Sequence, residues 1–170
     1  MTKKMLPYFS KRLIYLTNVE CHLLYGISAW GPMLTKRNLK KLMVKQNNAI
    51  RAVSNIKRRV RIEPYYKIGK FLKLEDLIEI SMVKISYRYV NDTLPQRIVN
   101  IFEFRNHNYN TRLNNNLRTP HHSSDIYNRS FLARAPHHWQ SIPQNIKEKR
   151  SIKSLNKSLT QLKIESYQNL

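Results

Sequence analysis

Apolar residues recur at helical spacing along the first hundred positions, and the clearest pattern lies between residues 36 and 54. Thr35 stands directly before this stretch and suits an N-cap, since its hydroxyl can accept a hydrogen bond from the first turn. The pattern therefore predicts an amphipathic helix over residues 36–54. Its apolar stripe consists of Leu39, Leu42, Met43, Gln46, Ala49, Ile50 and Val53.

A second stripe predicts a helix over residues 6–30, which Gly31-Pro32 ends because proline cannot continue the backbone hydrogen bonding. Glu75 and Asp76 suit the first turn of another helix, where the helix dipole favours negative charge. The apolar stripe of the helix predicted over residues 6–30 consists of Phe9, Leu13, Leu16, Leu23, Ile27 and Trp30. Further helices are predicted over residues 63–68, 75–91 and 95–102.

The helical period is lost after Glu103. Residues 104–125 are rich in Asn, His, Arg and Ser, which predicts an irregular segment with a short extended stretch at residues 108–113. Residues 126–143 are mixed, and we expect Phe131, Leu132 and Trp139 to anchor them. A last helix is predicted over residues 151–166, with Ser151 as its N-cap and with Ile152, Leu155, Leu159 and Leu162 facing inward.

The whole pattern indicates a mainly α fold in two regions. We expect a helical bundle over residues 1–103 and a C-terminal extension over residues 104–170, with the irregular segment and the terminal helix in the extension. A chain of 170 residues is long enough for one such domain with a modest core.

Charge narrows the range of partners. The chain has 31 Lys and Arg against 10 Asp and Glu, which gives a net charge of +21. This charge indicates a polyanionic partner, such as nucleic acid or an anionic membrane. No apolar run approaches the 18 or more residues of a membrane-spanning helix, so we expect no such helix. Of the two polyanions we expect nucleic acid as the partner and no membrane. A single cysteine excludes a disulfide framework, and three glycines exclude a glycine-rich phosphate loop.

The basic residues of the first half are not balanced by acids, because no Asp or Glu occurs between Thr35 and Arg61. An ordinary solvated face usually mixes both signs, although such a face remains the alternative interpretation. We predict that this face binds phosphates. Its candidate residues are Arg37, Lys40, Lys41, Lys45, Arg51, Lys57, Arg58, Arg59 and Arg61.

Aromatic residues beside basic ones suggest a second patch, since bases of single strands stack on such rings. Tyr109 and Arg112 are the candidates, because their neighbours are polar. Tyr87 and Tyr89 also flank an arginine, but they lie in a predicted helix with a wide apolar face and are expected in the core.

The sequence contains no recognisable catalytic centre. The three aspartates, Asp76, Asp92 and Asp125, are far apart, and no carboxylate pair has the spacing of two-metal catalysis. The histidine pairs at 121–122 and 137–138 lack the spacing of a zinc site. Cys21 is expected to be a packed core thiol. We therefore expect neither a metal nor another cofactor in this chain.

Four phrases in order add a resemblance to a known family. They are HLLYGISAWG at 22–31, KQNNAIRAVSN at 45–55, HNYNTR at 107–112 and WQSIPQNIK at 139–147. Together they resemble the C-terminal end of the reverse transcriptase of non-LTR (LINE-like) retrotransposons of the jockey type. Gln46-Asn47-Asn48 departs from the usual Gln-Lys-Arg, and Gln140-Ser141-Ile142 departs from Asn-Ser-Leu.

The resemblance implies a thumb, the helical bundle that grips the template–primer duplex, followed by the C-terminal extension of the polymerase. The family holds its catalytic aspartates and Mg²⁺ in the palm, whose Asp-Asp motif this chain lacks. We therefore expect a non-catalytic fragment rather than an RNA-directed DNA polymerase. We also expect a truncated reading frame, in which Met1 need not be the original start.

The resulting hypothesis is a thumb-like fragment that binds the backbone of RNA or an RNA/DNA duplex inside the cell, in the nucleus or the cytoplasm. One alternative is a protein-interaction module that self-associates or binds a palm through the face that the palm would cover. A non-functional pseudogene product is the other.

Overall fold

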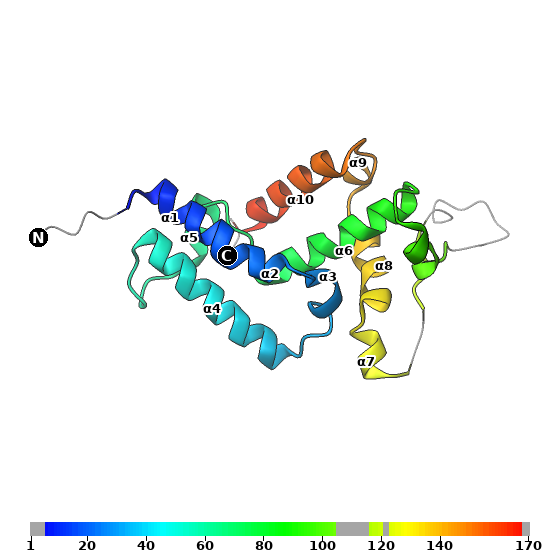
Figure 1. Ribbon diagram of the computed structural model, residues 1–170, viewed down its shortest axis with the longest axis horizontal. Coiled ribbons are helices and arrows are strands. Elements are labelled where there is room, and N and C mark those ends of the chain that lie inside the picture. The colour runs from blue at the N-terminus through cyan, green and yellow to red at the C-terminus, as the bar shows by residue number, and fades with distance from the viewer. Residues whose placement is uncertain (1–5, 105–115, 121–122, 168–170) are drawn as a thin grey trace, which may run out of the picture.

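Helix α6 (Leu74–Val90) lies at the centre of the molecule, and α3 (Ile27–Trp30), α4 (Lys36–Ser54), α8 (Phe131–Ser141) and α10 (Ile152–Ser166) pack around it (Figure 1). The computed structural model describes residues 6–104, 116–120 and 123–167. Within them the fold is mainly α, as the sequence predicts. Buried residues occur on several sides of α6, which explains its central place. They are Leu74, Leu77, Ile78, Ile80, Met82, Val83, Ser86 and Tyr87.

Helix α4 spans the predicted residues, and its predicted stripe faces inward. Gln46, Ile50 and Val53 are buried, and the other members of the stripe are partly buried. The Thr35 hydroxyl accepts a hydrogen bond from the Asn38 N–H at 3.3 Å, so the expected N-cap is confirmed. Helix α5 (Glu63–Ile68) follows, and Tyr66 and Phe71 join Ile50 in a small core beside α1 (Tyr8–Tyr15).

The predicted helix over residues 6–30 is wrong as a single element. After α1 comes a π-helical turn, Leu16–Glu20, then α2 (Cys21–Leu24). Gly26 then takes a left-handed conformation with φ 60°, which glycine adopts without strain and which separates α2 from α3. The π turn inserts residues into the helical repeat and shifts the stripe.

The shift changes which side chains of α1 are buried. Tyr15 is buried and packs edge-to-face on Phe71, whereas the predicted core residues Phe9 and Leu13 are 72% and 51% exposed. Cys21 is exposed as well, so its predicted place in the core is wrong. Gly31 does follow the last residue of α3, and it lies so close to Ile78 that a side chain there would collide.

The second half of the chain is more helical than its sequence suggests. The 3-10 helix Gln96–Ile101 is followed by an isolated antiparallel bridge between Phe104 and Leu117. Helices α7 (Asp125–Asn128) and α8 occupy the stretch expected to be mixed. Pro136 lies inside α8 at the cost of one backbone hydrogen bond, and burial of the nearby Ala135 and Trp139 supports the helix there.

Helices α9 (Gln144–Lys147) and α10 complete the fold and pack on each other. Leu155 and Leu159 of α10 are fully buried, as its apolar pattern predicts. One core around α6 includes Trp139 and Leu155 from the second half beside Ile27 from the first, so both predicted regions contribute to it. The expected extended stretch at residues 108–113 lies outside the described residues.

Candidate nucleic-acid interface

The outer face of α4 carries a row of basic side chains. Because its buried stripe packs on α1, α5 and α6, the opposite face of the helix points to solvent. The buried Gln46 holds α4 against the start of α6. Its amide Nε2 donates to the Leu72 carbonyl at 2.9 Å, and its Oε1 accepts from the Leu74 N–H at 3.0 Å. Four exposed basic residues on this side of α4, called the α4 face below, are Arg37, Lys40, Lys41 and Lys45, and Lys36 at the start of the helix is exposed as well.

No ion pair neutralises the α4 face in the described residues, although Glu75 and Asp125 line a hollow that Lys40 also lines. Within the described part of the chain, no ion pair involves a side chain of α4. All the Asp and Glu residues of the sequence fall within that part. The uncompensated charges therefore create a positive potential that attracts a polyanion and that weakens with added salt.

Arg51 connects the α4 face with the basic loop that follows. Its guanidinium Nη1 donates to the Lys57 carbonyl at 2.9 Å and to the Val60 carbonyl at 2.7 Å. Arg51 therefore positions this loop against α4, in addition to any contact that it makes with a ligand. The basic loop presents Lys57, Arg58, Arg59 and Arg61, all of them exposed.

The second predicted patch, Tyr109 and Arg112, lies outside the described residues. The tyrosines expected in the core are placed there or beside it. Tyr87 is buried and its hydroxyl donates to the Lys149 carbonyl at 2.6 Å, and the Tyr89 hydroxyl donates to the Phe102 carbonyl at 2.7 Å. The Tyr89 ring also packs against the rings of Phe102 and Phe104.

Sequence reasoning missed a charged network where α6, α8 and α10 meet. The Lys163 Nζ lies 2.6 Å from Glu79 Oε2 and 3.5 Å from Asp76 Oδ1. His138 Nδ1 lies 3.7 Å from Glu79, and the Tyr167 hydroxyl donates to Asp76. The spacing of Asp76 and Glu79 places both on one helix face, but nothing in the sequence identifies their partners on α8 and α10.

This network lowers the pKa of Glu79. The His138 imidazole and the Lys163 ammonium hold the pKa of Glu79 down at about 2, against the opposing effect of partial burial. Burial and the neighbouring Asp76 raise the pKa of Tyr167. Asp76 and Glu79 are thus used within the protein and are not available to neutralise the α4 face.

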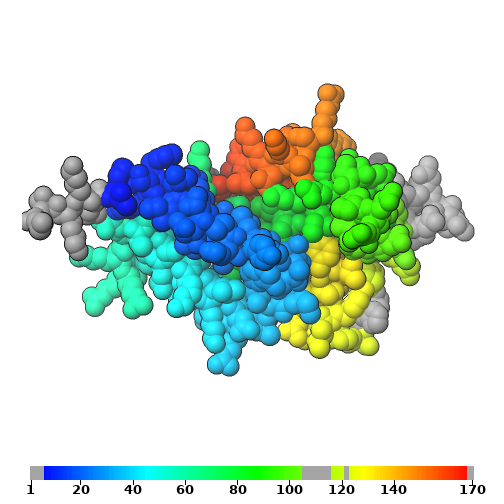
Figure 2. All heavy atoms as spheres, in the orientation of Figure 1, coloured from blue at the N-terminus to red at the C-terminus, as the bar shows by residue number. Residues whose placement is uncertain are grey.

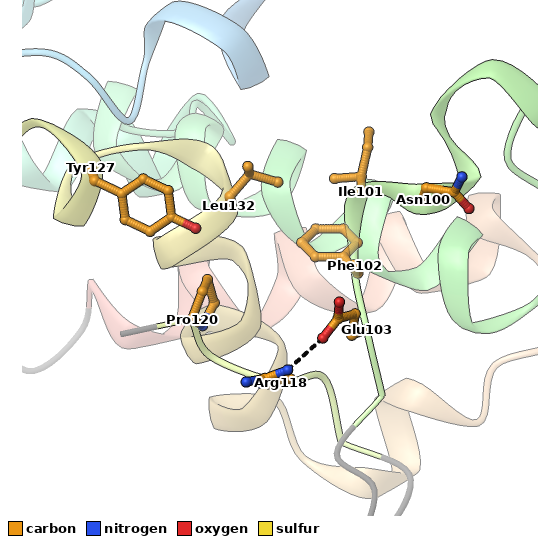
Figure 3. A pocket seen from close by; sticks show the side chains of 8 residues that line it. All are labelled: Asn100, Ile101, Phe102, Glu103, Arg118, Pro120, Tyr127 and Leu132. Carbon is orange, nitrogen blue, oxygen red and sulfur yellow. Dashed lines mark hydrogen bonds and ion pairs between the residues drawn. The ribbon is translucent and has the colours of Figure 1, made fainter. Parts of the chain in front are cut away.

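A hollow at the other end of the fold does not suit phosphate. Figure 3 shows it between the chain at Phe102 and Glu103 and the side chains of Tyr127 and Leu132. Its arginine, Arg118, is paired with Glu103 at 2.7 Å, so the wall carries no net charge from this pair. The residues described contain no cluster of three or more His, Cys, Asp and Glu side chains that could hold a metal ion.

Comparisons of the chain with protein-family models, with curated proteins and with solved structures gave no match. In the described ranges, no helix combines the length and the apolar character needed to cross a bilayer. The α4 face and the basic loop are therefore assessed on their own geometry and charge.

Proposed function

We propose that the chain is a nucleic-acid-binding module that holds a phosphate backbone along the α4 face and the basic loop. The observation that carries the proposal is the row of exposed cations on one side of an anchored helix, with no acid paired to any of them. Contacts of this kind neutralise phosphates and carry little sequence information. Binding is therefore expected to tolerate many sequences.

The geometry of α4 suits a backbone better than a small anion. Arg37 and Lys45 are eight residues apart, which corresponds to about 12 Å along a helix axis. The basic loop follows α4 in the chain and lies against Arg51 near its C-terminal end, where it adds further cations to the row. A row of this length spans several phosphates of one strand, since a duplex strand advances about 3.4 Å per phosphate along its axis.

This proposal includes the thumb-like role that the sequence resemblance implies. A capped helix with a fixed inner face can support the backbone of a template–primer duplex without taking part in chemistry. The proposed module is accordingly non-catalytic, and RNA or an RNA/DNA duplex is its expected partner.

Lysine footprinting tests the proposal directly. The folded protein is acetylated with and without a short RNA duplex, and the modified lysines are quantified by mass spectrometry. We expect RNA to protect Lys40, Lys41 and Lys45, while Lys149, which lies before α10, keeps its reactivity. Equal reactivity of all these lysines with and without bound RNA would refute the proposed interface.

A second candidate function is protein association through α1 and α2. Phe9 and Tyr25 are 72% and 85% exposed, and a contiguous exposed apolar surface of this kind often marks an interaction site. The other exposed apolar residues of this segment are Leu6, Tyr8, Leu13, Ile14 and Leu24. Light scattering separates the two functions: an RNA-binding monomer supports the first, and an oligomer indifferent to RNA supports the second.

A further inference from the structure

We propose that a groove between α5 and α10 is a second phosphate-binding surface, so that one molecule can hold two nucleic-acid segments at once. The groove has a volume of about 750 Å³. Lys67 and Lys70 line its α5 side, and Lys153 and Lys157 line its α10 side. The inference rests on the proposed function, because it assumes that the α4 face holds the first segment.

The four ammonium groups of the groove have no partner. Among the described residues none of these lysines takes part in a side-chain hydrogen bond or an ion pair. The wall also carries one acid, Glu165, which accepts a hydrogen bond from Gln161 at 2.9 Å and keeps its charge, so the four lysines outnumber the acid of the groove by three. Like charges around one hollow repel each other, and an anion that enters it relieves the repulsion.

Lys163 provides the contrast on the same helix. It points toward α6, where its ammonium is paired with both Asp76 and Glu79. Helix α10 therefore has one face on which a lysine is neutralised within the protein and another on which Lys153 and Lys157 are not. The unpaired face is the one that borders the groove.

The shape and lining of the groove favour a chain of phosphates over a membrane. Lys153 and Lys157 are one helical turn apart, about 6 Å along the axis, so they can follow consecutive phosphates of a strand. The side chains of Asn156, Thr160 and Gln161 add hydrogen-bonding groups. Ile164 lines the groove and Ile68, beside Lys67, is 71% exposed, but a lipid surface would require a wider row of large apolar side chains than these two provide.

Helix α10, which forms one wall of the groove, lies on the opposite side of Figure 1 from α4, whereas α5, the other wall, follows the basic loop and packs on α4. Figure 1 shows α4 along the lower side and α10 along the upper side, with α1 and α2 crossing between them. The space-filling view shows the same separation, with the blue N-terminal helices between the cyan and the orange-red surfaces (Figure 2). A straight duplex that lies along α4 would not reach the α10 wall of the groove. We therefore assign the groove to a second nucleic-acid segment.

A bridging assay with the full chain tests the inference. Two short RNA duplexes, one with a donor dye and the other with an acceptor, are mixed with protein, and energy transfer between them is measured. Binding of one labelled duplex is measured separately by anisotropy. The groove variant changes Lys67, Lys70, Lys153 and Lys157 to Gln. The control variant removes as many charges elsewhere, by changing Arg88, Arg97, Lys149 and Arg150 to Gln.

We expect the groove variant to lose at least about fivefold in energy transfer while it still binds single duplexes, and the control variant to retain both. If the groove variant does not fold, the pair Lys153→Gln and Lys157→Gln is expected to lower the transfer in the same direction. Full transfer in the folded groove variant, or in the folded variant with Lys153→Gln and Lys157→Gln, would overturn the second site and leave the α4 face untouched. Loss of single-duplex binding only in the groove variant would instead overturn the proposed function.

Discussion

The side-chain oxygen Oε1 of Gln46 accepts a hydrogen bond from the backbone N–H of Leu74 at 3.0 Å, which joins the middle of α4 to the first residue of α6. The same amide donates to the Tyr15 hydroxyl at 3.1 Å, and so it also connects α1. Gln46 is 1% exposed. A polar residue inside an apolar stripe is thus explained by the backbone and hydroxyl groups that it satisfies in the core.

Replacing Gln46 by Leu is therefore expected to destabilise the fold. The Leu74 N–H and the Leu72 carbonyl would lose their partner in the core, at a cost of about 2 kcal/mol. Urea unfolding followed by circular dichroism measures the change. The control is Asn48→Leu on the exposed face of the same helix. Equal stability of the two variants would contradict the role given to Gln46.

Stability is also expected to fall in acid because of Glu79. Its pKa is lowered from 4.5 to about 2 in the fold, so its charge stabilises the native state above about pH 4.5. This contribution, about 2 kcal/mol, is lost as the pH falls from 4.5 through 2. The Glu79→Gln variant should be less stable at neutral pH and show a shallower loss between these values. An unchanged pH profile of its unfolding free energy would contradict the prediction.

Arg51 is expected to order the basic loop through hydrogen bonds rather than through its charge alone. Arg51→Lys keeps the charge but loses the paired contacts with the Lys57 and Val60 carbonyls. Hydrogen exchange at the Val60 amide, which donates to the Lys57 carbonyl, should become about fivefold faster for a loss of about 1 kcal/mol. The exposed Arg37→Lys serves as the control and should leave this exchange rate unchanged.

Polymerase activity is not expected of this chain. Asp76 is held by Tyr167 and Lys163, Asp125 is paired with Arg129 at 2.8 Å, and Asp92 lies in the turn after α6. These separate places do not form the carboxylate pair that two-metal catalysis needs. The chain is incubated with a primed RNA template, deoxynucleotides and Mg²⁺, and any primer extension above a buffer control would disprove the prediction.

The sequence predicted α4 and its cap because one regular stripe and one suitable residue, Thr35, act locally. The prediction failed over residues 6–30. There a π turn changes the helical repeat and Gly26 changes the direction of the chain, and neither feature is visible in the pattern of apolar residues. The groove lysines were missed for another reason. Lys67 and Lys157 are far apart in the sequence, and only the packing of α10 near α5 brings them to one hollow.

The salt dependence of RNA binding tests the central claim most directly. If the α4 face and the basic loop contact about five phosphates, the slope of log K against log[salt] should lie near −4 to −5. Changing Arg37, Lys40, Lys41 and Lys45 together to Gln should flatten the slope by about three to four units, with little change in thermal midpoint. Anisotropy titrations at several salt concentrations measure it. An unchanged slope in the folded variant would contradict the assignment of this face as the nucleic-acid interface.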